Sequence, residues 1–105
     1  MNRFGFIIRG CLAAVLVSVS AAAAEKPKTI TVMTHDSFSI SKAVAARFEA
    51  ENHATLKFLK AGDAGAALNQ AILARGNPMA DVFFGVDNTF LSRALKADIF
   101  QPYAS

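Results

Sequence analysis

Side chains able to bind a ligand or carry out chemistry gather in three short turns of this sequence. In each turn an acidic residue stands beside a hydroxyl, an amide or a glycine, directly after an apolar run. Three carboxylates suit a cation or an amine, whereas free N–H groups at helix starts suit anionic groups. The three turns contain His35, Asp36 and Ser37; Asp63 between Gly62 and Gly65; and Asp87, Asn88 and Thr89.

A nucleophilic triad is one interpretation of the first turn. Adjacent side chains on an extended segment point to alternate sides, so His35 and Asp36 are badly placed to act as base and orienting acid for Ser37. A second interpretation is structural. Asp residues are good helix N-caps, and Asp63 and Asp87 each stand just before a predicted helix. His35 is then either a ligand contact or an ordinary surface histidine.

Metal and phosphate motifs are weak. His35, Asp36, Asp63 and Asp87 offer oxygen and nitrogen ligands, but no compact metal-ligand spacing is present, so we expect no metal site. The glycines at 62 and 65 lack the lysine of a P-loop and the third glycine of a dinucleotide fingerprint.

Strand and helix patterns alternate along the chain and place these turns. Apolar runs predict strands over 28–34, 54–60 and 81–86, and apolar spacing predicts helices over 40–51, 66–75 and 89–97. Ser37 or Ser39 is the expected cap of the first helix, whose apolar stripe is Ile40, Val44 and Phe48.

The expected fold class is α/β, built of βαβ units on a parallel sheet. The run Val82-Phe83-Phe84 is continuous, which is typical of a central parallel strand covered on both faces. The carboxyl ends of parallel strands meet at one edge, so the three polar turns should lie side by side there, where open α/β sheets bind ligands.

The first 24 residues have the pattern of a cleaved Sec signal peptide. Arg3 and Arg9 precede an apolar stretch, and Ala22-Ala23-Ala24 resembles a signal peptidase site, which would leave Glu25 as the first residue. The alternative is a membrane anchor, but the uncharged run over 10–24 is shorter than the ~20 residues a spanning helix needs. Cys11 lies before most of that run, not at the cleavage point of a lipoprotein.

Composition excludes several classes of function. Without Arg3 and Arg9, nine basic and eight acidic residues remain, interspersed and nearly balanced, which is no footprint for nucleic acid. Cys11 is the single cysteine, so residues 25–105 carry out no disulfide, thiol or zinc–thiolate chemistry. That segment has 81 residues, enough for one small core.

Several segments together resemble the thiamine-binding type of ABC-transporter substrate-binding protein. They are Thr31-Val-Met-Thr-His-Asp-Ser-Phe38, Ala61-Gly-Asp-Ala-Gly65 leading to Leu68-Asn69, Asn77-Pro-Met-Ala-Asp-Val82 and Phe84-Gly-Val-Asp-Asn-Thr-Phe-Leu91. The resemblance implies a two-lobed, type II periplasmic binding fold that closes on its ligand. Residues 25–105 would form the N-terminal part of lobe 1, truncated, because such proteins are several-fold longer.

The resemblance also implies a function. Members bind a solute in the periplasm and deliver it to an ABC permease, with no catalysis and no cofactor, and we expect a monomer at full length. The ligand would be thiamine or its phosphates. The positions that match ligand contacts are His35, where members often have Tyr, and Asp63 with Ala64 beside it. Asp36, Ser37, Asp87 and Asn88 are further candidates, as contacts or as residues that only shape the cleft wall.

Two alternatives remain open from the sequence. A carrier of the same class could bind another solute, such as ferric iron. A different class is a free-standing secreted α/β domain that acts as an interaction module or a hydrolase.

Overall fold

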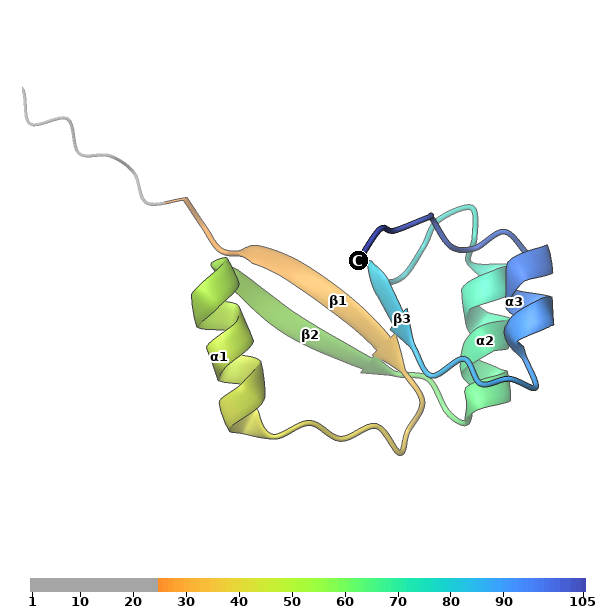
Figure 1. Ribbon diagram of the computed structural model, residues 1–105, viewed down its shortest axis with the longest axis horizontal. Helices are drawn as coiled ribbons and strands as arrows, with labels where there is room; N and C mark the ends of the chain where they lie inside the picture. The colour runs from red at the N-terminus through yellow and green to blue at the C-terminus, as the bar shows by residue number, and fades with distance from the viewer. Residues whose placement is uncertain (1–24) are drawn as a thin grey trace, which may run out of the picture.

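Strands and helices alternate through the part of the chain that the structure describes. The structure is a computed structural model that describes residues 25–105, so the predicted signal peptide lies outside it. The elements, in order, are β1 (Lys28–Thr34), α1 (Lys42–Asn52), β2 (Ala54–Lys60), α2 (Ala64–Leu73), β3 (Val82–Phe84) and α3 (Leu91–Lys96) (Figure 1). None of the helices in this range is long and apolar enough to cross a membrane.

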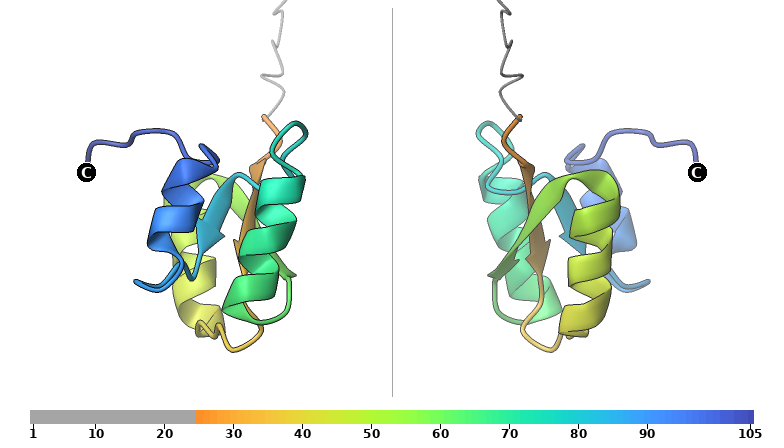
Figure 2. Two further views of the ribbon diagram at one scale, coloured as in Figure 1. Left: turned by 90° about the vertical axis from the view of Figure 1, so that its right-hand side faces the viewer. Right: turned by 90° about the vertical axis from the view of Figure 1, so that its left-hand side faces the viewer.

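The strands form one parallel sheet with the order β2-β1-β3, which confirms the predicted α/β class with βαβ units. The chain moves from β1 to one neighbour and then crosses back past β1 to the other. Crossovers of the same hand in opposite directions place their helices on opposite faces. Accordingly, α1 lies on one face of the sheet, and α2 and α3 lie on the other (Figure 2).

The core lies between the sheet and α2. Met33, Leu59 and Phe83 are partners in register on neighbouring strands, so their side chains share one face. They pack with Ala67 and Ala71 of α2. Alanines let the helix approach the sheet closely, and Leu68 is completely buried. The helix α3 lies next to α2. A hydrogen bond joins the two helices, in which Nη2 of Arg93 donates to Oδ1 of Asn69.

The position of β3 corrects one prediction. The strand expected over 81–86 as a central strand is a three-residue edge strand, and β1 is central instead. Val82 is 48% exposed and Phe84 is 53% exposed, so this run is covered mainly on the face of Phe83. The strand ends at Phe84 because Gly85 follows with a φ of 119°, which is outside the β region.

The first helix also begins later than predicted. Its N-cap is Ser41, whose Oγ accepts the N–H of Val44 at 3.2 Å, so neither Ser37 nor Ser39 caps it. The predicted stripe of Ile40, Val44 and Phe48 is largely exposed, and Ile40 precedes the helix.

The other helix bounds differ by one to two residues. The second helix begins at Ala64 instead of 66 and ends at Leu73 instead of 75, and the third spans Leu91–Lys96 instead of 89–97.

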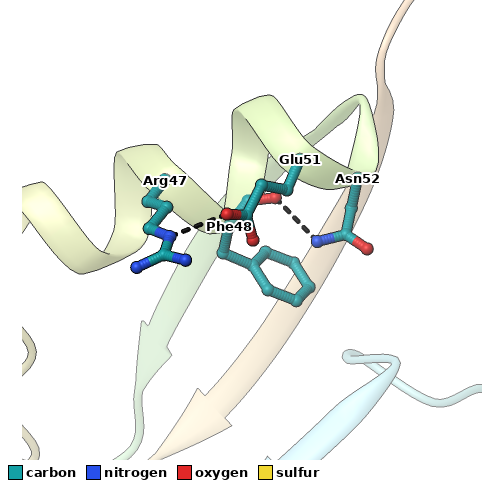
Figure 3. Close-up of polar contacts among 4 residues, drawn as sticks. All are labelled: Arg47, Phe48, Glu51 and Asn52. Atoms are coloured by element: carbon teal, nitrogen blue, oxygen red, sulfur yellow. Dashed lines mark hydrogen bonds and ion pairs between the residues drawn. The ribbon is translucent and has the colours of Figure 1, made fainter.

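Polar contacts on α1 are local or face the edge of the sheet. Arg47 and Glu51 form an exposed ion pair at 2.7 Å, and the amide of Asn52 donates to the carbonyl of Phe48 at 2.9 Å (Figure 3). Glu49 instead reaches the sheet, where its Oε1 accepts the N–H of Leu56 at 2.7 Å. The outer edge of β2 is therefore partly satisfied by a side chain.

Candidate functional site

The three polar turns meet in one open depression at the carboxyl edge of the sheet, as the sequence predicted. Its volume is about 380 Å³. It is lined by His35, Asp36, Ser37, Gly62, Asp63, Ala64, Gly85 and Asp87. Asn88 is the one candidate residue that does not line it. The juxtaposition follows from the sheet order, because the turn after β1 lies between those after β2 and β3.

Asp36 ties the first turn to the second. Its N–H donates to the carbonyl of Gly62 at 2.8 Å, and its Oδ1 accepts the N–H of Gly62 at 3.1 Å. Nζ of Lys60 donates to the carbonyl of Asp36 at 3.1 Å. Asp36 therefore caps no helix, and its carboxylate binds a backbone amide instead of orienting His35. The triad interpretation loses its orienting acid.

Asp63 is the N-cap of α2, which confirms the capping interpretation for this residue. Its backbone is extended, with φ −70° and ψ 172°, and its Oδ1 accepts the N–H of Ala66 at 2.8 Å. The cap uses one carboxylate oxygen. The other has no hydrogen-bond partner among residues 25–105, so the carboxylate retains an acceptor that faces the depression or solvent.

Asp87 stabilises the turn that leads into α3. Its Oδ1 accepts the N–H of Phe90 at 3.1 Å, and its carbonyl accepts the N–H of Leu91 at 3.0 Å. The N-cap position of α3 itself is Phe90, which makes no side-chain cap. Asp87 therefore stabilises the turn that precedes α3 and is not the predicted N-cap of that helix.

His35 is half-buried, and its ring makes no hydrogen bond within the described part of the chain. Its ring centroid lies 6.3 Å from that of Phe84. Phe84 in turn packs on Phe38, with centroids 4.9 Å apart, and Phe38 packs on Phe58 at 5.6 Å. A row of aromatic rings thus runs from the depression across the sheet to β2.

Sequence reasoning missed several residues that build this site. Gly85 lines the depression, Phe84 lies beside the His35 ring, and Phe38 packs on Phe84. Phe38 and Gly85 stand within segments that carry the family resemblance, but their roles depend on contacts between distant strands. Thr34 was also missed: it is completely buried, and its Oγ1 has no hydrogen-bond partner in residues 25–105.

The electrostatics of the depression are acidic. Three carboxylates line it, and Lys60 is the cation held beside them. Within residues 25–105, no three His, Cys, Asp or Glu side chains are arranged to hold a metal ion. A ligand that carries an amine or a positively charged ring fits such a surface better than a bare anion does.

A second hollow, of about 260 Å³, lies near the start of β3. Its lining includes Met33 and Phe83 from the core, together with Arg75, Asp81 and Asp98. Asp81 is already engaged there, because its Oδ2 accepts the N–H of Thr31 at 2.9 Å. The polar turns of the sequence do not contribute to this hollow.

Fold and site together define an α/β domain with an open, acidic depression at the carboxyl edge of its parallel sheet. The chain is similar to the thiamine-binding periplasmic protein of Escherichia coli strain K12, with 33% identity over 98 residues. The match covers 90% of this chain and 29% of that protein, so the chain spans less than a third of its relative's length. No protein-family model matches the chain. No solved structure matches it either.

Proposed function

We propose that the chain forms the first part of lobe 1 of a periplasmic solute-binding protein that serves an ABC importer. The observation that carries the proposal is the convergence of the three polar turns in one depression, within a chain similar to a thiamine-binding periplasmic protein. Open α/β sheets bind ligands at that edge. The protein binds and delivers a solute and is not an enzyme.

The proposed ligand is thiamine or one of its phosphates. Thiamine carries a cationic ring and an amino group, and the depression presents three carboxylates to such groups. Asp36, Asp63 and Asp87 each use one oxygen to hold a backbone amide, which fixes the carboxylate and leaves its second oxygen for a ligand. The N-terminus of α2 at Asp63 and Ala64 offers N–H groups and a positive dipole end to a phosphate.

The depression supplies one wall of the proposed cleft. Binding pockets usually bury ~70–90% of a small ligand, which an open surface does not achieve. In the proposed two-lobed fold a second lobe covers the ligand, and the closed monomer docks on its permease after export by the signal peptide. The ligand contacts from this wall are His35, Asp36, Ser37, Asp63, Ala64, Asp87 and Asn88, of which Asn88 lies beside the depression.

Calorimetric titration tests this function. The full protein that the gene encodes is titrated with thiamine, thiamine monophosphate, ferric citrate and, as a matched control, the uncharged pyrimidine half of thiamine. We expect thiamine and its phosphate to bind and the uncharged half to bind much more weakly. Binding of ferric iron alone would move the assignment to the alternative solute. No binding of any solute, together with hydrolase activity or capture of a protein, would favour the secreted α/β module.

A further inference from the structure

Gly85 is packed against the ring of His35, and both residues line the depression. A Cβ atom at position 85 would lie 2.5 Å from Cδ2 of His35 and 3.3 Å from its Nε2. The first distance is well inside van der Waals contact, so the ring occupies the space that any side chain at position 85 would need. The backbone of Gly85 also has a φ of 119°, which side-chain-bearing residues rarely adopt.

Packing alone holds the ring in place. Gly85 lies against one edge of the His35 ring, and Phe84 lies beside the ring with the two ring planes tilted by 37°. Phe38 supports Phe84 and is tied to the same turn, because its N–H donates to the carbonyl of His35 at 3.2 Å. Within residues 25–105 no hydrogen bond orients the imidazole, so its position depends on the packing against Gly85 and Phe84.

The contact also orients the ring. Cδ2 is the atom nearest to the missing Cβ, with Nε2 and Cγ next at 3.3 and 3.5 Å. The Nδ1–Cε1 edge therefore lies farthest from Gly85. Nε2 is crowded by the glycine, whereas Nδ1 is the ring nitrogen that stays clear of this contact. His35 lines the depression together with Gly85.

We propose that Gly85 is a positioning residue for ligand binding: it provides the seat that holds His35 in the orientation in which its ring meets the ligand. This inference rests on the proposed function, since it names what prepares one contact of the same site. Gly85 itself acts through His35 and makes no polar contact with the ligand. A larger residue at position 85 displaces the imidazole from the depression without removal of any carboxylate.

Histidine side-chain NMR signals test the seat without any ligand. The chain has two histidines, so His35→Ala assigns the signals, and His53 on the opposite edge serves as an internal reference. We expect Gly85→Ala to shift the His35 signals and leave those of His53 unchanged. The control is Gly76→Ala, which has open space around it and should leave the signals of both histidines unchanged. Unchanged His35 signals in Gly85→Ala would overturn the proposal.

Melting temperatures distinguish the steric clash between a side chain at position 85 and His35 from the backbone strain at that position. Strain at a positive φ costs the same with or without the imidazole, whereas the clash disappears when His35 is Ala. We expect Gly85→Ala to lower the melting temperature less in the His35→Ala background than in wild type. If Gly85→Ala alone does not fold, the double variant must fold for the proposal to stand. Equal losses in both backgrounds would contradict it.

The thiamine affinity of the full protein tests whether the contact between Gly85 and His35 affects ligand binding. His35→Ala is expected to weaken binding roughly 2- to 10-fold, the range of one aromatic contact. Gly85→Ala should weaken it by a similar factor, and the double variant should bind no more weakly than His35→Ala alone. Additive losses would show that Gly85 acts independently of His35. A wild-type protein without thiamine affinity would overturn the proposed function, while the NMR signals and melting temperatures would still decide whether Gly85 positions the ring.

Discussion

Asp36 and Gly62 are joined by a reciprocal pair of hydrogen bonds, at 2.8 Å from the Asp36 N–H to the Gly62 carbonyl and at 3.1 Å from the Gly62 N–H to Oδ1 of Asp36. The pair locks the turn after β1 to the turn after β2. Two of the three turns that line the depression are therefore connected directly by hydrogen bonds.

This pair predicts different effects for two substitutions at position 36. Asp36→Ala leaves the Gly62 N–H without its side-chain acceptor and should lower the free energy of unfolding by about 1 kcal/mol, the usual net value of one hydrogen bond. Asp36→Asn keeps an acceptor oxygen and should cost clearly less. Urea denaturation of both variants of the full protein measures the difference. No loss in Asp36→Ala would mean that the side-chain bond contributes nothing to stability.

Asp63 caps a helix and is also a proposed ligand contact. One substitution distinguishes these two roles. Asn caps about as well as Asp, so Asp63→Asn should hardly change the melting temperature. If the charge meets a thiamine cation or amino group, affinity falls about 10- to 150-fold, which corresponds to the roughly 1.5–3 kcal/mol of a charge-assisted bond. Titration calorimetry on the full protein measures both binding constants.

Asp98→Asn is the matched control for that experiment. Asp98 follows α3, lines the second hollow and lies outside the depression, and Asn tolerates its φ of 52°. Its affinity for thiamine should equal that of wild type. Unchanged affinity in Asp63→Asn as well would reduce Asp63 to a helix cap.

Thr34 carries a buried hydroxyl whose Oγ1 has no partner among residues 25–105. An unsatisfied buried polar group costs stability, so Thr34→Val should raise the free energy of unfolding by about 1 kcal/mol. Thr34→Ala removes the hydroxyl but also a methyl group, and should be less stable than Thr34→Val. Thermal melts of the variants of the full protein check the order. A Thr34→Val protein less stable than wild type would indicate that the hydroxyl is satisfied in solution.

The edge of β3 should make residues 25–105 associate. The outer edge of β2 carries lysines and the Glu49–Leu56 bond, whereas β3 has no charged residue and exposes Val82 and Phe84. Uncharged strand edges and apolar patches promote association. We expect concentration-dependent oligomers by sedimentation velocity and a poorly cooperative melt.

Val82→Lys should reduce this association, because a lysine on an edge strand opposes pairing. The control is Leu73→Lys on α2, where a leucine outside the sheet is 86% exposed. Its association should match that of wild type. A monomer with a sharp two-state melt at all concentrations would contradict the prediction that the edge of β3 and the exposed side chains of Val82 and Phe84 promote association.

The predicted signal peptide has its own test. The Arg3/Arg9 segment and the Ala22-x-Ala24 site predict cleavage after Ala24. Intact-mass measurement of exported protein should give Glu25 as the first residue. A product that retains Cys11, with or without a lipid, would show that the segment is processed differently or not at all.

Local sequence determined the strands and the meeting of the polar turns. The predicted bounds of the first two strands, Lys28–Thr34 and Ala54–Lys60, are those of the structure. Alternation of strand and helix patterns implied parallel strands, and parallel strands carry their following turns to one edge. Asp63 as a helix cap was also readable, because a cap depends on the three residues that follow it.

Tertiary structure decided what depends on segments far apart in the chain. A hydrophobic run does not indicate which strand is central. The edge position of β3 follows from the sheet order, in which β2 and β3 pair on either side of β1. The N-cap of α1 is Ser41, because the turn at residues 36–37 and the packing of Phe38 on Phe58 and Phe84 come before the helix. The Asp36–Gly62 bond spans 26 residues, and the seat of His35 on Gly85 joins two different strand ends. Periodicity records only neighbours within a few residues, whereas these contacts arise when the sheet brings distant turns together.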